Sequence, residues 1–251
     1  MITGRWVPPP NYWDTVRSPR YSLSFTLPLL VAYEALAFLL SRFDMVSVRN
    51  GADVLLKHLF VGLGGQYGLA AFGLVLVGGG VALVWRDVRR SGGIRPRYFL
   101  FMAGESVAYA LLFGTVAGTL TGLLLPRMAL VSPPAAPQAA ALGLPAQLMV
   151  SLGAGIYEEL LFRVLLVSGL MLIGRRVFGW SGRGAAIFAV VIGALVFSAF
   201  HYVGAYGDRF SVGSFTFRAV AGLLFSGLYV LRGFGITAWT HAMYDVFLTV
   251  L

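Results

Sequence analysis

Residues 184–203 read GAAIFAVVIGALVFSAFHYV, a run without Asp, Glu, Lys or Arg. A helix needs about 20 apolar residues to cross the hydrocarbon core of a bilayer, so this run is typical of a membrane span. Six other stretches share its character, and we expect spans at 21–40, 66–85, 98–125, 146–173, 214–230 and 234–251. The sequence therefore predicts an all-α fold, a polytopic transmembrane helix bundle of about seven spans (six to eight).

The composition supports this class. Of the 251 residues, 58% are hydrophobic and only 12% are charged, and Cys is absent. This composition argues against a disordered chain, a disulfide-stapled domain and a thiolate metal site. It also has too few polar side chains to cover the surface of a soluble enzyme. The net charge of +9 comes from Arg clusters between the apolar runs. That pattern follows the positive-inside rule and argues against a nucleic-acid partner.

The same patterning predicts the organisation of the chain. Residues 1–20 are expected to form an N-terminal cytoplasmic arm, and 21–251 a single transmembrane domain. The amphipathic stretch 52–60 is expected to lie at the membrane interface, and the Pro/Ala-rich stretch 132–145 to form an external loop. The predicted location is an integral, multi-pass position in a bacterial cytoplasmic membrane, with the N-terminus inside.

Ionisable residues inside the expected spans are the strongest functional signal. Each charge at the bilayer centre costs roughly 2.5–3.5 kcal/mol on insertion scales, so these side chains must face one another or a wet cavity. They are Glu34, Glu105, Glu158, Glu159, Arg163, His201, His241 and Asp245.

Most of these residues form three short motifs. In the first, Glu159 and Arg163 are four residues apart and share a helix face, while Glu158 is rotated by about 100° and is free to point elsewhere. His201 ends the second motif, and His241 and Asp245 share a face in the third. Carboxylates and imidazoles from three helices suffice to activate water and to stabilise an oxyanion.

The pattern EExxxR (158–163), FxxxH (197–201) and HxxxD (241–245), each in its own apolar span, resembles the CAAX protease and bacteriocin-processing (CPBP) family of intramembrane proteases, which includes the Ras-converting CAAX endopeptidase. The resemblance covers residues 146–251, the expected protease-like core. It implies an intramembrane endopeptidase that cleaves near the C-terminal region of a membrane-anchored or lipidated peptide or protein substrate.

The resemblance also implies a role for each site residue. Glu158 would be the general base for the attacking water, and His201 would hold the same water. His241 and Asp245 would stabilise the tetrahedral oxyanion. Glu159 and Arg163 would form a buried pair that orients their helix. The family has Asn or Asp at the last position, and the Asp245 of this chain can donate a hydrogen bond only when it is protonated.

Three alternatives stay open, one for the cofactor and two for the activity. Glu158, His201 and His241 could bind Zn²⁺, with Glu159 as the base. We favour a metal-free glutamate site, because Arg163 competes for Glu159 and no HExxH pair is present. The same buried charges could instead serve a proton-coupled transporter, or the fold could be a non-catalytic immunity or scaffold protein.

Overall fold

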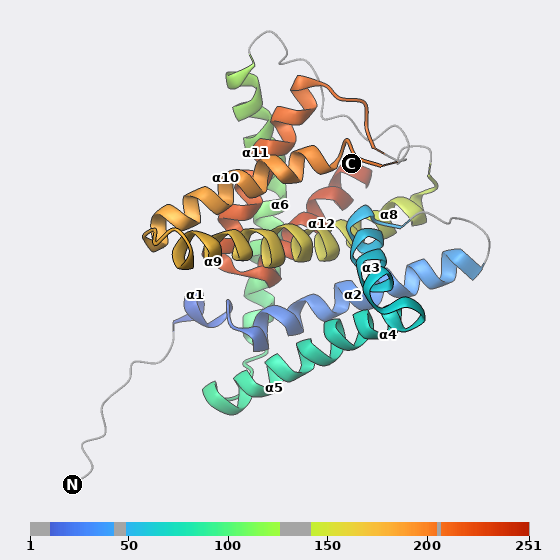
Figure 1. Ribbon diagram of the computed structural model, residues 1–251, viewed down its shortest axis with the longest axis vertical. Coiled ribbons are helices and arrows are strands. Elements are labelled where there is room, and N and C mark those ends of the chain that lie inside the picture. The colour runs from blue at the N-terminus through green and yellow to red at the C-terminus, as the bar shows by residue number, and fades with distance from the viewer. Residues whose placement is uncertain (1–10, 43–48, 126–141, 205–206, 251) are drawn as a thin grey trace.

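The computed structural model describes residues 11–42, 49–125, 142–204 and 207–250. Within these ranges the chain is helical and contains no strand (Figure 1). The helices are α1 (Tyr12–Thr15), α2 (Pro19–Arg42), α3 (Gly51–Gly64), η1 (Gly65–Tyr67), α4 (Gly68–Gly73), η2 (Leu74–Gly78), α5 (Gly79–Ser91), α6 (Arg97–Leu124), α8 (Leu144–Gly153), η3 (Ala154–Val167), α9 (Ser168–Arg176), α10 (Gly182–Phe200), α11 (Val212–Arg232) and α12 (Phe234–Val250).

The predicted all-α bundle is confirmed, and each expected span coincides with helical residues over most of its length. Five helical stretches are long and apolar enough to cross a membrane: 19–42, 51–91, 97–124, 182–200 and 212–232. The expected spans at 146–173 and 234–251 correspond to the consecutive helices α8, η3 and α9 and to α12. These two carry most of the ionisable site residues, and α12 has only 17 residues.

Helix α3 contains the stretch 52–60, whose position at the membrane interface stays a prediction. Asp53 is fully buried, and one face of the helix packs against η3. Gly65, with a φ of 54°, ends α3 and reverses the chain. Helix α4 then folds back on α3 so closely that a Cβ on Gly68 would lie 2.4 Å from the Phe60 carbonyl oxygen.

Helix α12 lies at the centre of the bundle, in contact with α2, α6, α8, η3 and α11. Gly155 of η3 permits a close approach to α12. A Cβ at this position would lie 2.5 Å from the Ala238 carbonyl oxygen and 2.6 Å from the Ala242 Cβ. Small residues let two membrane helices approach backbone to backbone. Here they bring the site residues of η3 and α12 together.

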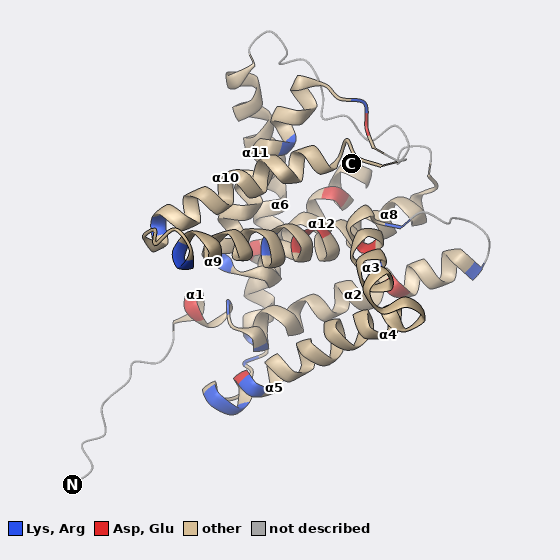
Figure 2. Cartoon of the chain, viewed as in Figure 1, with Lys and Arg blue, Asp and Glu red and all other residues tan. Residues whose placement is uncertain are grey.

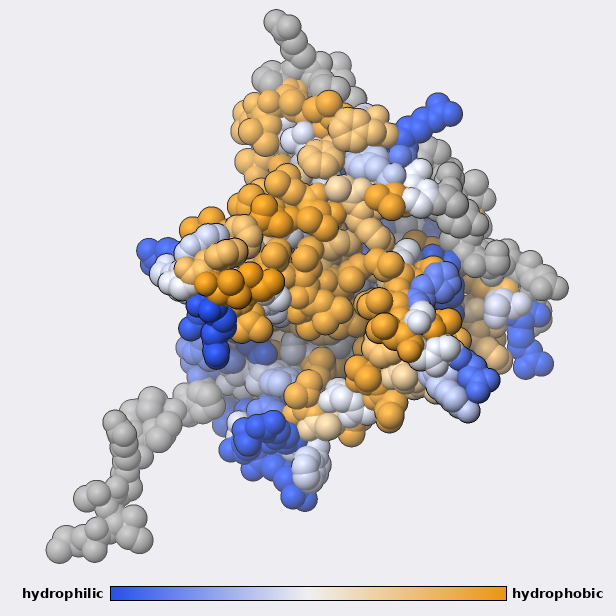
Figure 3. Space-filling model, in the orientation of Figure 1, coloured by the Kyte–Doolittle hydropathy of each residue, from blue (hydrophilic) through white to orange (hydrophobic). Residues whose placement is uncertain are grey.

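The outer surface is apolar, as a bilayer requires. Large hydrophobic side chains face outward, among them Leu74, Leu100 and Leu123, each more than 70% exposed. Figure 3 shows hydrophobic residues covering much of the visible face. Basic residues instead collect at helix ends, including the last turns of α5 and α9 (Figure 2). A chain with this surface is an integral membrane protein.

The second half of the expected N-terminal arm packs on the bundle. Val16 is fully buried, and the Arg232 guanidinium at the end of α11 donates to the Trp13 carbonyl oxygen at 3.1 Å. Residues 1–10 lie outside the described residues, as do residues 132–141 of the expected external loop.

Candidate functional site

Glu159 is the hub of the candidate site. Its Oε1 lies 2.6 Å from His241 Nδ1 and 3.1 Å from Arg163 Nη1, and all three residues are buried. The contact with Arg163 is the pair expected from the four-residue spacing. The contact with His241 joins η3 to α12 across the close approach at Gly155. The segment that carries Glu158, Glu159 and Arg163 is π-helical, a geometry that is frequent at functional sites.

Two aromatic rings enclose the charged pair. The Arg163 guanidinium lies 4.4 Å from the centroid of the Phe197 ring and 5.5 Å from that of Phe225. Phe225 also stacks on His241, with ring centroids 4.4 Å apart. A cation is attracted to the face of an aromatic ring, most strongly when both are out of water. The two phenylalanines therefore stabilise the guanidinium and fix the plane of the imidazole.

Glu158 points away from this pair, as its rotation along the helix predicts. Its Oε1 accepts a hydrogen bond of 2.9 Å from Nδ2 of Asn50, the residue that caps α3. The Asn50 Oδ1 accepts the Ala52 backbone N–H, so the amide orientation is fixed and the NH₂ group faces the carboxylate. Glu158 retains 9% exposure, whereas Glu159 has none. The two adjacent glutamates therefore differ. Glu159 is held by ionisable side chains, and Glu158 by a neutral amide.

His201 is the first residue after α10. Its Nδ1 lies 2.9 Å from the Phe197 carbonyl oxygen. A carbonyl can only accept, so Nδ1 carries a proton and Nε2 is left for a water molecule or a ligand. The rings of His201 and His241 lie against the same phenylalanine, with centroids 4.9 Å and 6.2 Å from that of Phe197, and Glu158 is on the adjacent helix η3. The structure thus gathers these three residues in one region of the bundle.

Asp245 follows one turn after His241 on α12. Its Oδ2 lies 3.7 Å from His241 Nε2, too far for a hydrogen bond but close enough for electrostatic interaction. Its side chain is 29% exposed, against 6% for that of His241. The two ring nitrogens of His241 thus face carboxylates of different helices.

The zinc alternative concerns Glu158, His201 and His241. Among the described residues, no three His, Asp or Glu side chains are arranged so that they could hold a metal ion. The three donors do not fit a shared ion as they are placed, since a zinc ligand set needs donors about 2 Å from one centre. Metal dependence stays a prediction for experiment.

Two glutamates outside the site, Glu105 and Glu34, stabilise helix contacts. Glu105 accepts two hydrogen bonds of 2.9 Å from Arg232 and joins α6 to α11. Glu34 contacts Arg49, Lys57 and the Tyr157 hydroxyl, which joins α2 to α3 and η3.

Sequence reasoning missed three residues around the site. Asn50 reads only as a helix cap in the sequence, because its partner Glu158 is 108 positions away. Asp53 accepts from the Tyr33 hydroxyl at 2.7 Å and pairs with Arg49, contacts that hold the N-terminal turn of α3 against α2. Phe225 stacks on His241 from a helix without a charged motif, so no sequence signal pointed to it.

Comparison with known proteins gives one match. A family model described as "Rce1-like: Type II CAAX prenyl endopeptidase Rce1-like" matches residues 140–247, a range that includes all six predicted site residues. Comparisons with curated proteins and with solved structures gave no match.

Proposed function

We infer that the chain hydrolyses a peptide bond near the C-terminal region of a membrane-anchored or lipidated substrate. Through residues 140–247 it belongs to the Rce1-like family of type II CAAX prenyl endopeptidases. Membership of this family indicates a CAAX-type membrane protease. The mechanism, the substrate and the residues that act are our proposal. We further propose that the membrane is a bacterial cytoplasmic membrane, because the Arg-rich connections are short.

The difference between the two adjacent glutamates carries the proposal. Glu159 already serves two partners, Arg163 and His241, and is sealed from water. Glu158 accepts one hydrogen bond among the described residues and keeps some exposure. A general base must reach the water that it deprotonates, so Glu158 is the residue suited to this role.

The proposed reaction proceeds through a tetrahedral intermediate. A water molecule held by Glu158 and by Nε2 of His201 gives a proton to Glu158 as its oxygen attacks the peptide carbonyl. His241, fixed by Glu159 and Phe225 and acting as an imidazolium, donates from Nδ1 to Glu159 and from Nε2 to the developing oxyanion, and Asp245 assists when it is protonated. Glu158 then returns the proton to the leaving amine as the C–N bond breaks.

The buried charge pair has a positioning role in this scheme. Arg163 lies between two aromatic rings and neutralises Glu159, which in turn accepts from Nδ1 of His241. Replacing either member of a buried pair alone leaves an uncompensated charge, which costs roughly 3–5 kcal/mol. We therefore expect changes at Arg163 to affect folding and catalysis together.

Cleavage of a farnesylated CAAX peptide by the purified chain in lipid vesicles tests the proposal. Glu158→Gln keeps the shape and can still accept from Asn50, but it cannot take a proton. We expect kcat to fall by about 10²–10⁴, with KM little changed. Glu105→Gln is the control, because it changes a membrane glutamate outside the site; its loss of the Arg232 ion pair should lower stability and leave the kcat of the folded protein unchanged. A folded Glu158→Gln variant with wild-type kcat would overturn the proposed role.

A further inference from the structure

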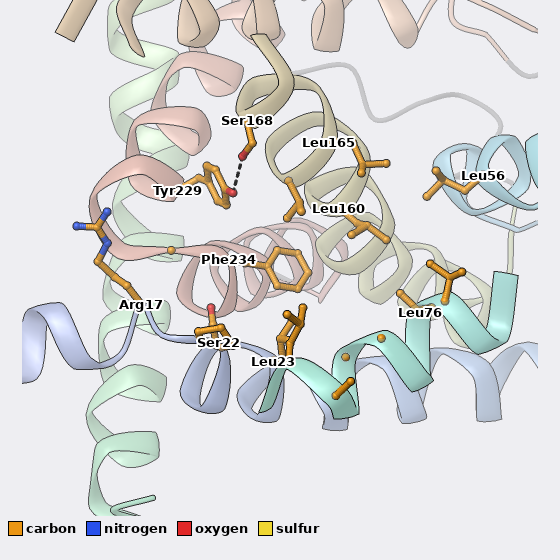
Figure 4. A pocket seen from close by; sticks show the side chains of 18 of the residues that line it. Arg17, Ser22, Leu23, Leu56, Leu76, Leu160, Leu165, Ser168, Tyr229 and Phe234 are labelled. Carbon is orange, nitrogen blue, oxygen red and sulfur yellow. Dashed lines mark hydrogen bonds between the residues drawn. The ribbon is translucent and has the colours of Figure 1, made fainter. Parts of the chain in front are cut away.

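A large apolar cavity lies outside the proposed active site. It has a volume of about 990 Å³ and lies between α2, the η2–α5 segment, the η3–α9 segment and the junction of α11 and α12 (Figure 4). Leu23, Leu76, Leu160 and Phe234 are among the residues that line it. None of the six proposed site residues lines it. The proposed active site and this cavity are therefore separate.

The cationic side chains of the cavity lie at one end, and the other polar side chains that line it, Ser22, Ser168 and Tyr229, are neutral. Arg17 and Arg86 line it where the start of α2 meets the end of α5, a junction fixed by the Arg20 backbone N–H donating to Asp87 at 3.0 Å. Figure 4 shows Arg17 at one side of the cavity, with Leu56 and Leu76 at the other. The cavity thus has the polarity of an amphiphile, with cationic side chains at one end and hydrocarbon at the other.

Arg17 and Arg86 form no ion pair among the described residues of the bundle. Both residues are exposed, and neither guanidinium has an ion-pair or hydrogen-bond partner among the described residues. Two other arginines of this region do have partners, since Arg20 pairs with Asp87 and Arg232 pairs with Glu105. Two unpaired cations beside an apolar cavity favour an anionic ligand.

We propose that this cavity binds an anionic phospholipid, with its phosphate between Arg17 and Arg86 and one acyl chain along the apolar wall. The wall from Phe72 to Arg86 is about 20 Å long at ~1.5 Å per helical residue, and half of the hydrocarbon core is about 15 Å. The cavity can therefore take a chain that extends from the headgroup layer to the bilayer centre. Basic pockets between membrane helices bind anionic headgroups in this manner.

The bilayer itself supplies such a ligand, whereas the tail of a cleaved substrate fits the cavity less well. A substrate tail would have to leave its peptide bond beside Glu158 and His201, which do not line the cavity. Leu160 and Val164, which do line it, belong to the same helix as Glu159. A bound lipid would therefore fill the space behind the helix that carries the proposed base. This inference does not depend on the peptidase proposal.

The test is native mass spectrometry of the purified full chain titrated with phosphatidylglycerol or with phosphatidylcholine of the same acyl composition. We expect the wild type to bind one phosphatidylglycerol at least tenfold more tightly than phosphatidylcholine. Arg17→Gln with Arg86→Gln should abolish this preference. Arg89→Gln with Arg90→Gln removes two cations from the same helix outside the cavity and should preserve it.

A second pair of variants tests the place of binding. Gly79 lines the cavity and Gly73 does not, and a Cβ at either glycine would meet no atom within 4 Å. Gly79→Leu should fill the cavity and lower phosphatidylglycerol binding at least tenfold, while Gly73→Leu should bind as the wild type does. Unchanged binding in a folded Gly79→Leu variant would overturn the proposal. Equal binding of the two lipids by the wild type would also overturn it, as would displacement of phosphatidylglycerol by a farnesylated peptide.

Discussion

Gly155→Ala tests whether the site depends on the close approach of η3 and α12. The new Cβ would lie 2.5 Å from the Ala238 carbonyl oxygen, and ordinary contact begins near 3.4 Å. The two helices must therefore separate by about 0.9 Å, because a backbone carbonyl cannot move aside alone. The same shift would lengthen the 2.6 Å contact between Glu159 and His241 to about 3.5 Å, at the limit of a hydrogen bond.

Two quantities should change in this variant. Overpacking a well-packed core costs typically 1–3 kcal/mol, so the free energy of unfolding should fall by about that amount. A displacement of about 1 Å at a catalytic group can cost ~10²-fold, so kcat should fall by roughly that factor. Unfolding by denaturant in micelles, followed by circular dichroism, measures the first quantity. Peptide cleavage in vesicles measures the second.

Gly169→Ala provides the control for Gly155→Ala. Gly169 also lies in a helix, but a Cβ there would meet no atom within 4 Å. Replacing Gly by Ala in a helix stabilises it by roughly 0.5–1 kcal/mol, so this variant should unfold later and keep its activity. If Gly155→Ala is as stable and as active as Gly169→Ala, the reasoning about the close approach is refuted.

Three further predictions concern the surroundings of the site. Asn50→Ala removes a hydrogen bond to the Glu158 carboxylate that is worth about 1.5–3 kcal/mol, so kcat/KM should fall roughly 10- to 150-fold. Asn50→Asp places a second carboxylate beside Glu158 and should lower kcat/KM further. Tyr33→Phe removes the hydroxyl that contacts the Asn50 backbone and should lower both stability and cleavage. Tyr157→Phe loses the hydrogen bond to Glu34 and should lower stability alone. Unfolding and cleavage measured on both variants would distinguish them. Asp245→Asn introduces an amide that donates a hydrogen bond at any pH, so the variant should still cleave the peptide. As the pH rises, its activity should decline less than that of the wild type. A steeper decline would contradict a donor role for Asp245.

The fold could be predicted from the sequence because bilayer thickness imposes a length on each apolar run. The contacts within one helix were predictable as well, since a spacing of four residues places Glu159 beside Arg163 and His241 beside Asp245. The rotation of Glu158 away from its neighbour follows from the same geometry.

Contacts between helices were not predictable in this way. The bond from Asn50 to Glu158 and that from His241 to Glu159 depend on how helices dock, and docking depends on small residues such as Gly155. Asp53 is a further example, because it is buried and its charge is compensated by Arg49 and Lys57. Periodicity alone does not reveal a partner on another helix.

The most direct test of the account is an experimental structure of the chain in a lipid environment at a resolution that shows ordered water. The account predicts one water molecule within about 3 Å of both the Glu158 carboxylate and Nε2 of His201, with His241 on the side where a peptide carbonyl would bind. Side chains of Glu158, His201 and His241 that share no solvent molecule, or that point into lipid, would contradict it.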